Sequence, residues 1–178
     1  FFYVFAFSNY LPLHKKVLIT ASDIFTISSQ KQFEKIALKV FRFQYENNKV
    51  YRDFCNFLKT DVQRVKSLQQ IPFLPIQFFK SHEVVSNENP AQVTFTSSGT
   101  TGMVTSRHLV TDVSLYEDSY RNGFSQFYGN IEDYVVLALL PSYLERDGSS
   151  LIYMVEDLIN LSNQPESGFY LHNHDDLI

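Results

Sequence analysis

The stretch Phe95-Thr-Ser-Ser-Gly-Thr-Thr-Gly-Met103 carries the chain from a β-forming segment into a loop of small and hydroxyl-bearing residues. Its two glycines, Gly99 and Gly102, allow a tight turn in which successive backbone N–H groups point inward. The loop also contains uncharged hydroxyl donors at Ser97, Ser98, Thr100 and Thr101. Phosphate oxygens need many donors within a short distance, so residues 97–102 favour phosphate binding. A flexible connection without a ligand is the alternative interpretation.

Both sides of this loop predict β-structure. Gln92–Thr96 alternates and is rich in β-formers, and His108–Val110 predicts a second strand. A strand directly before a Ser/Gly/Thr loop strengthens the phosphate-binding interpretation. No GxxxxGK[ST] pattern occurs in the sequence, which excludes a Walker-type loop.

Upstream of the loop, apolar residues recur at helical spacing. The sequence predicts a helix over 29–46 that begins at a capping box formed by Ser29 and Gln32. A second, shorter helix is predicted from the stripe Val50, Tyr51, Phe54 and Leu58. Two prolines within 71–75 favour an extended segment, and a short helical turn is expected to end near His82.

Downstream of the loop, predicted helices and strands alternate. Asp112 is expected to cap a helix that carries apolar residues over 115–127. The continuous apolar run Tyr134–Leu140 indicates a strand covered on both faces. Residues 148–150 lead into another helix, and Phe169–Leu171 predicts a further strand. This order indicates an α/β fold with helices on the faces of a sheet.

Composition limits the classes of partner. The chain has 178 residues, which fits one domain or part of a larger one, and its formal net charge of −4 argues against nucleic acid as the main partner. The single cysteine, Cys55, excludes an intrachain disulfide and favours a cytoplasmic location. We interpret it as a buried, inert thiol, with a reactive thiol as the alternative. The 17 Phe and 11 Tyr indicate a Phe-rich core or an apolar substrate tunnel.

Residues 1–20 are interpreted as a disordered or non-native extension. The apolar run Phe1–Phe7 is followed, not preceded, by Lys15 and Lys16, unlike a signal peptide. It is also much shorter than the roughly 20 apolar residues that cross a bilayer, so no stable membrane insertion is expected. A segment that touches a membrane surface is the alternative.

Ser98-Gly-Thr-Thr-Gly102 resembles the signature loop of the adenylate-forming superfamily, which includes acyl-CoA synthetases and peptide-synthetase adenylation domains. Over roughly residues 23–178 the sequence more closely resembles the acyl-protein synthetase branch, the LuxE-like family. The stretches that carry this resemblance are Ile71–Val84, Ser97–Gly102 with Ser106–His108, and Leu139–Ser150. The resemblance implies that residues 21–178 are an incomplete N-terminal portion of the large domain. A helical N-terminal region would precede the strands and helices of a layered sheet.

The resemblance also implies a two-step reaction. A carboxylate, which in this branch can belong to a fatty acid, attacks the α-phosphate of ATP and gives acyl-AMP and pyrophosphate. A thiol, which can be a protein cysteine, then takes the acyl group. Mg²⁺ would bridge the phosphates and offset their charge. The superfamily's later motifs do not occur before Ile178, so the isolated chain is expected to be inactive.

Two other functions are compatible with these residues. An aryl- or acyl-CoA ligase shares the loop but uses CoA as the acceptor. A non-catalytic acyl- or nucleotide-binding module would keep the fold without the reaction. The acceptor preference distinguishes the first of these from an acyl-protein synthetase. For the second, a Tyr-Gly-x-Thr-Glu-like stretch and a distal Asp and Lys beyond Ile178 would favour the enzyme, and an early stop would favour the module.

The sequence departs from the superfamily pattern after the loop. Many members continue with Pro-Lys-Gly, whereas Met103–His108 contains no lysine. Arg107 could supply the positive charge as a bidentate phosphate partner, or it could be a surface arginine at a strand edge. Thr105 could extend the set of hydroxyl donors. His108 is interpreted as structural, because no base or metal partner is evident beside it.

Three other polar clusters are interpreted as solvated surface, and no metal site is predicted. Lys80, His82 and Glu83 follow an apolar turn and are expected at an exposed helix end. Glu145–Asp147 is expected to form an exposed turn. His172–Asp176 contains two His and two Asp, which is a weak metal signal and is interpreted as a polar loop.

Overall fold

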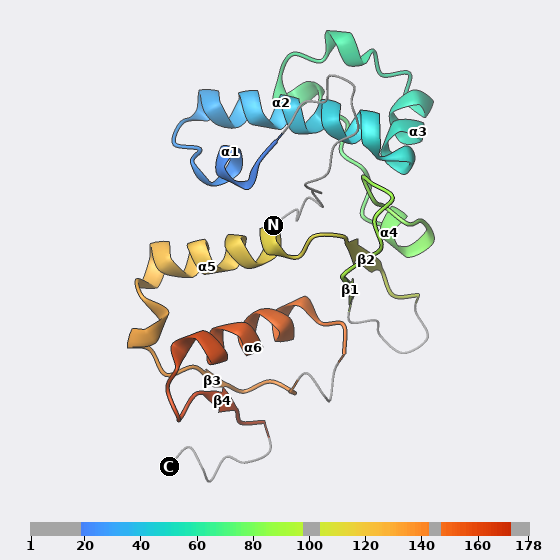
Figure 1. Cartoon of the computed structure of the whole chain (residues 1–178). Coiled ribbons are helices and arrows are strands. Elements are labelled where there is room, and N and C mark those ends of the chain that lie inside the picture. The colour runs from blue at the N-terminus through green and yellow to red at the C-terminus, as the bar shows by residue number, and fades with distance from the viewer. Residues whose placement is uncertain (1–18, 98–103, 143–146, 172–178) are drawn as a thin grey trace. The chain divides into compact units, whose positions relative to one another are not determined.

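The computed structural model describes residues 19–97, 104–142 and 147–171 (Figure 1). The chain divides into two compact units. Unit 1 comprises Phe1–Gln92 and Ser106–Asp112, and unit 2 comprises Val93–Thr105 and Val113–Ile178. The mixture of helices and short strands agrees with the predicted α/β class. The layered sheet of an adenylate-forming domain is not visible among the described residues.

Unit 1 is mainly helical. Its described elements are α1 (Ala21–Phe25), α2 (Gln30–Asn47), α3 (Lys49–Phe57), the 3-10 turns η1 (Val62–Arg64) and η2 (Leu68–Gln70), α4 (Phe78–Ser81) and β2 (Arg107–Val110). These bounds confirm the two predicted helices, the helical turn before His82 and the strand after the loop. Residues 72–75 contain no regular structure, as the prolines predict.

The start of α2 differs from the predicted capping box in one bond. Ser29 Oγ accepts a hydrogen bond from the Gln32 N–H (3.3 Å), as expected. The Gln32 side chain, however, accepts from the backbone N–H of Ser28 (2.8 Å), one residue before the predicted partner. A complete reciprocal box occurs at α1 instead, between Thr20 and Asp23.

Of the segment 1–20, which the sequence predicts to be an extension, residues 1–18 lie outside the described residues.

The core of unit 1 lies between α2 and α3 and contains Phe41, Tyr51, Cys55 and Val65. The rings of Phe41 and Tyr51 meet edge to face with centroids 6.2 Å apart. The Tyr51 hydroxyl donates to the Pro72 carbonyl oxygen (2.6 Å), which ties the extended segment to α3. Cys55 is fully buried, and burial raises the pKa of its thiol. The prediction of a buried thiol is therefore confirmed.

Unit 2 contains β1 (Val93–Thr96), α5 (Ser114–Tyr128), the 3-10 turn η3 (Ile131–Asp133), β3 (Leu137–Ala138), α6 (Ser150–Ser162) and β4 (Gly168–Phe169). Strands β3 and β4 are parallel, with Leu137 opposite Gly168 and Ala138 opposite Phe169. Helix α6 connects them along the chain, which confirms the predicted strand–helix–strand order. Parallel neighbours require such a crossover connection.

Two predictions in unit 2 were wrong in detail. Val113, rather than Asp112, occupies the cap position of α5, and its backbone is already helical. The run 134–140 forms a strand only at Leu137–Ala138, because the backbone bonds to β4 reach only from Val136 to Ala138. Nor is the run covered on both faces within the described residues, since Leu139 remains 59% exposed.

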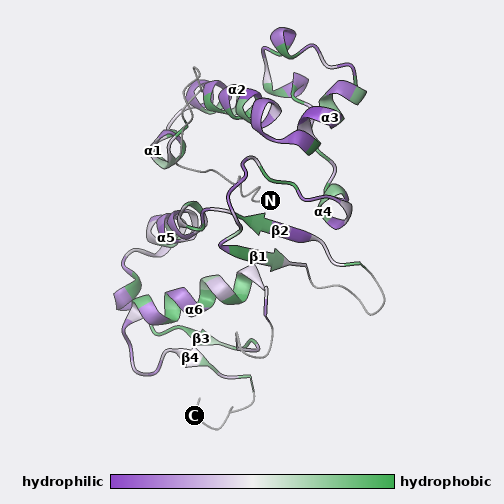
Figure 2. Cartoon of the chain, turned by 45° about the vertical axis from the view of Figure 1, so that its right-hand side comes forward, coloured by the Kyte–Doolittle hydropathy of each residue, from purple (hydrophilic) through white to green (hydrophobic). Residues whose placement is uncertain are grey.

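The helices differ in how apolar their sequences are (Figure 2). Helix α6 has a more apolar sequence than α2, and it buries Ile152, Leu158 and Ser162. In α2 only Val40 and Phe41 are fully buried. Among the described helices, none combines the length and apolar character needed to cross a bilayer.

Candidate functional site

Strand β1 leads into the predicted phosphate loop. Its side chains alternate so that Phe95 is buried and Thr96 is exposed. Ser97, the first residue of the predicted loop, follows directly and is exposed. The other predicted loop residues lie outside the described residues: Ser98, Gly99, Thr100, Thr101 and Gly102. Their phosphate-binding role stays a prediction.

The buried ring of Phe95 anchors this strand in an aromatic cluster. Its centroid lies 5.3 Å from the ring of Tyr116 on α5 and 5.6 Å from that of Tyr153 on α6. Both pairs are edge-on, the arrangement that the charge distribution of aromatic rings favours. The Tyr116 hydroxyl donates to the Ser150 carbonyl oxygen (2.8 Å) at the start of α6. The residue two positions before Ser97 is thus fixed by both helices.

A polar network joins the same two helices beside the aromatic cluster. The Arg121 guanidinium holds the Asp157 carboxylate through two hydrogen bonds, of 2.9 Å from Nε and 2.8 Å from Nη2. The Tyr120 hydroxyl donates to the same carboxylate (2.8 Å). Burial raises the pKa of Asp157, but these bonds outweigh it and hold that pKa below its usual value. The carboxylate is therefore ionised at neutral pH.

Tyr153 extends this network to Glu117, to which its hydroxyl donates at 2.7 Å. Burial together with this bond raises the pKa of Tyr153 to about 12. Sequence reasoning assigned none of these polar contacts. The available signal was the i, i+4 pair of Glu117 and Arg121, whose side chains lie 3.4 Å apart. The long-range partner Asp157 cannot be read from spacing.

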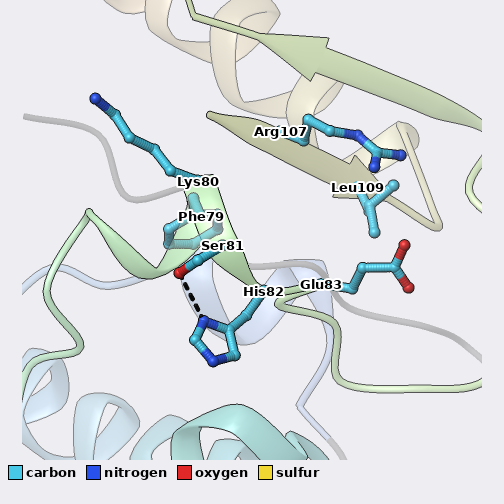
Figure 3. Close-up of a pocket in the computed structure, with 7 residues that line it drawn as sticks. All are labelled: Phe79, Lys80, Ser81, His82, Glu83, Arg107 and Leu109. Atoms are coloured by element: carbon cyan, nitrogen blue, oxygen red, sulfur yellow. Dashed lines mark hydrogen bonds between the residues drawn. The ribbon is translucent and has the colours of Figure 1, made fainter. Parts of the chain in front are cut away.

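Arg107 opens β2 and is exposed, within unit 1. It lines a pocket of about 260 Å³ with Phe79, Lys80, Ser81, His82, Glu83 and Leu109 (Figure 3). Figure 3 shows Lys80 extending away from the other labelled side chains, while Glu83 and Leu109 lie on the side of Arg107. Arg107 has no ion-pair partner among residues 19–97, 104–142 and 147–171. An exposed guanidinium is a group that can donate two hydrogen bonds to an oxyanion.

The size and charge of this pocket limit what it can hold. Its volume lies below the roughly 300–1,000 Å³ of pockets that enclose whole ligands, so it fits only part of a nucleotide. Lys80 and Arg107 bring positive charge to its rim, and Glu83 brings one negative charge. Ser81 Oγ lies 2.8 Å from His82 Nδ1, and the His82 ring stacks on Phe78. His82 is thus held at the exposed end of α4.

His108 packs against Phe79, with ring centroids 5.4 Å apart. Burial lowers the pKa of its imidazole. A neutral ring against an aromatic neighbour supports the structural interpretation of this histidine. Thr105 is exposed in the segment before β2, and its proposed contribution as a hydroxyl donor stays a prediction.

The remaining polar clusters supply no metal site in the part of the chain that the structure describes. No group of three or more His, Cys, Asp or Glu side chains there is arranged to hold a metal ion. Lys80, His82 and Glu83 are exposed, as expected for a solvated helix end. Asp147 lies in an exposed turn, whereas Glu145, Arg146 and residues 172–176 lie outside the described residues.

Comparison with known proteins identifies the family. The family described as acyl-protein synthetase, LuxE, matches residues 13–118. This range is more than half of the chain and includes β1, the whole Ser/Gly/Thr loop, Arg107 and the segment 71–84. The chain belongs to the acyl-protein synthetase family. The stretch 139–150, which also resembles this family, lies beyond the matched residues.

A relative supports this membership. The long-chain-fatty-acid–luciferin-component ligase of Photorhabdus luminescens is 34% identical over 90 residues, which cover 48% of this chain and 77% of that relative. No solved structure was found to match the chain. The acyl-protein synthetase assignment thus rests on sequence, and the geometry above describes the chain's own residues.

Proposed function

We propose that this acyl-protein synthetase chain takes part in activating a long-chain fatty acid with ATP, through an acyl-adenylate, for transfer to a protein thiol. The observation that carries the proposal is the family match over residues 13–118, which contains the entire predicted phosphate loop. The name of the Photorhabdus relative supports both the ligase class and the long-chain acid. The described segments β1 and β2 flank the loop as the sequence predicts.

In this proposal the loop residues Ser97–Gly102 donate backbone and hydroxyl hydrogen bonds to the phosphates of ATP. Arg107 takes the place of the lysine that follows the loop in many adenylate-forming enzymes, and it donates a charge-assisted bond to a phosphate oxygen. Mg²⁺ would bind to phosphate oxygens of ATP and offset their negative charge.

The proposed reaction has two steps, and in each step one bond forms as another breaks. A carboxylate oxygen of the acid attacks the α-phosphorus of ATP, the bond to the β-phosphate oxygen breaks, and pyrophosphate leaves. A thiolate then attacks the acyl carbon, a thioester forms, and AMP leaves with the electrons of the broken acyl–oxygen bond. Positive charge near the phosphates lowers the barrier of the first step by stabilising charge that develops on the leaving group.

The first step is tested by ATP–pyrophosphate exchange with the intact protein that carries this sequence. Labelled pyrophosphate should enter ATP when tetradecanoic acid is present, and much less with butyric acid. Hydroxylamine should trap the activated acyl group as a hydroxamate. Absence of exchange with all saturated acids of four to eighteen carbons would contradict the proposal and favour the non-catalytic module.

The acceptor is tested separately with labelled tetradecanoic acid. We expect the label to appear on a protein as a thioester that neutral hydroxylamine releases, and we expect no acyl-CoA. Formation of acyl-CoA at a comparable rate would favour the CoA ligase instead. This second measurement leaves the conclusion about adenylation intact, whichever thiol is used.

A further inference from the structure

A short backbone contact joins the end of β1 to the start of α6, both in unit 2. The N–H of Thr96 donates to the carbonyl oxygen of Gly148 at 2.7 Å. Thr96 is the last residue of β1, and Ser97 begins the predicted phosphate loop. Gly148 lies two residues before α6, whose N-terminal end is next to β1 in Figure 2. A residue far along the chain therefore holds the strand at the point where the loop begins.

The geometry at Gly148 requires a glycine for two reasons. Its φ of +77° lies in the left-handed region, which side chains with a Cβ disfavour. A Cβ at this position would also lie 2.8 Å from Thr96 Oγ1 and 3.5 Å from the Thr94 carbonyl oxygen. The first distance is too short for any real contact, so either the Thr96 side chain would have to rotate or one of the two segments would have to move. The absence of a side chain at Gly148 leaves the space that the Thr96 side chain occupies at the end of β1.

Hydrogen bonds hold the start of α6 in place, next to the contact between Thr96 and Gly148. Ser149 caps the helix through its Oγ, which accepts from the Ile152 N–H at 3.4 Å. The Ser150 carbonyl oxygen accepts from the Tyr116 hydroxyl. Phe95, the neighbour of Thr96, is buried against Tyr116 and Tyr153. The start of α6 and Phe95 are thus both held by other contacts, and Thr96 is the residue that a side chain at position 148 would meet first.

We propose that Gly148 is a positioning residue for ATP binding, which sets where the phosphate loop leaves β1. This inference rests on the proposed function, because it assigns the loop to ATP phosphates. The Gly148 carbonyl oxygen accepts from the Thr96 N–H, and the missing side chain leaves the Thr96 side chain in its place. Gly148 touches neither the acid nor the reacting phosphate; it acts through Thr96.

The test uses Gly148→Ala in the intact protein, with ATP affinity measured by isothermal titration. We expect the Kd for ATP to rise at least ten-fold, whereas the KM for the fatty acid in exchange assays changes less than two-fold. A purely structural defect would affect both substrates together. The double variant Thr96→Ala/Gly148→Ala removes the closest contact. Its increase in log Kd for ATP over the wild type should be at most half of the increase in Gly148→Ala.

Two other glycines provide matched controls in the same unit. Gly129 also has a positive φ, of +88°, but nothing lies within 4 Å of its Cβ position, so Gly129→Ala adds the backbone strain without the contact. Gly123 lies within α5 with nothing near its Cβ position, so Gly123→Ala adds only a methyl group. Both variants should bind ATP within two-fold of the wild type.

The outcomes separate this inference from the proposed function. ATP binding by the wild type without exchange would contradict fatty-acid activation, while the Kd comparison would still test Gly148. No ATP binding by the folded wild type would overturn both. A folded Gly148→Ala with unchanged Kd would overturn the inference alone. If Gly148→Ala does not fold, Gly148→Asn, which tolerates positive φ better and keeps the same Cβ, must show the ten-fold loss for the inference to hold.

Discussion

Arg107 is the described residue that we propose as the source of positive charge at the predicted phosphate site. It is exposed at the first position of β2 and has no ion-pair partner among the described residues. A hydrogen bond from a charged group is worth about 1.5–3 kcal/mol. Arg107→Ala in the intact protein should therefore raise the KM for ATP roughly 10- to 100-fold, as measured by pyrophosphate exchange.

The control for Arg107 is another arginine of unit 1. Arg64 is exposed and pairs with Asp61 three residues before it, at 3.2 Å. Arg64→Ala should leave the KM for ATP unchanged, because this pair lies outside the pocket that Arg107 lines. An Arg107→Ala variant with wild-type ATP affinity and turnover would show that Arg107 is a surface arginine.

His108 gives a prediction about pH. Burial lowers the pKa of its imidazole from a reference value of 6.5. Below pH 6.5 the imidazole is therefore protonated in the unfolded chain, while it stays neutral in the folded chain until the pH reaches its lower pKa. The free energy of unfolding should fall as the pH drops from 6.5 toward the lower pKa of the folded state. His108→Gln should flatten this dependence in urea denaturation curves recorded between pH 5 and 7.5.

An unchanged slope in His108→Gln would show that the buried imidazole does not account for the loss of stability in acid.

At the scale of elements, the strongest described contact between α5 and α6 is the Arg121–Asp157 pair with its Tyr120 bond. Asp157→Ala would leave Tyr120 without this acceptor and Arg121 with only Glu117 as an ion-pair partner among the described residues, and both side chains are only partly exposed. We expect a loss of about 1–3 kcal/mol, reduced from a fully buried pair because water screens Arg121. Thermal unfolding followed by circular dichroism measures it.

The pH dependence of this effect has a definite sign. The pKa of Asp157 is lowered in the folded state, so its contribution is complete above about pH 3.8 and is lost as the pH falls further. Asp53→Ala is the control, since Asp53 forms an exposed pair with Lys49 at 2.6 Å. It should change the melting temperature little. Equal losses in the two variants would argue against a special role for the α5–α6 network.

The elements were predictable where local chemistry decides them. Ser29 and the apolar stripe behind it define α2, and the alternation before Thr96 defines β1. The apolar run 134–140 predicted a strand that is longer than the one observed. Apolar residues indicate burial, but the length of a strand depends on the partner strand that it pairs with. That partner, β4, aligns with only a few of these residues. Neighbours in space, not residue preferences, set the ends of such a strand.

At the scale of the whole molecule, each of the two compact units has its own buried residues. Phe41 in unit 1 is 3% exposed, and its truncation to alanine should cost about 3–5 kcal/mol. Cys55, the chain's only cysteine, reports on this core because it is fully buried beside Phe41. Phe41→Ala should raise the rate of thiol labelling by roughly 150- to 5,000-fold when opening equilibrates before labelling.

Phe57 gives the matched control for this labelling experiment. It lies at the end of α3 and is 83% exposed, so Phe57→Ala removes the same ring without opening the core. Its labelling rate should stay within about three-fold of the wild type. Similar acceleration in both variants would mean that Cys55 reacts through a local fluctuation of α3 rather than through opening of the Phe41 core.

The candidate site was predictable only in part at this scale. The loop and Arg107 could be named from the sequence because small residues and charge carry a local signal. The contact between Thr96 and Gly148 could not, since 51 residues separate these positions along the chain. The same holds for Asp157 and its partners on α5. Contacts between residues that are far apart along the chain form only when helices and strands pack. A single sequence does not indicate which residues will then be in contact.

The tyrosine cluster of unit 2 gives the chain an optical signal of its own. The sequence contains no tryptophan, so ultraviolet emission comes from tyrosine. Tyr120 and Tyr153 donate hydrogen bonds to carboxylates, which quench tyrosine fluorescence by accepting the phenolic proton after excitation. Separation of α5 from α6 should therefore increase the tyrosine fluorescence of the protein. No dye is needed to follow this opening, and it can be timed by stopped flow.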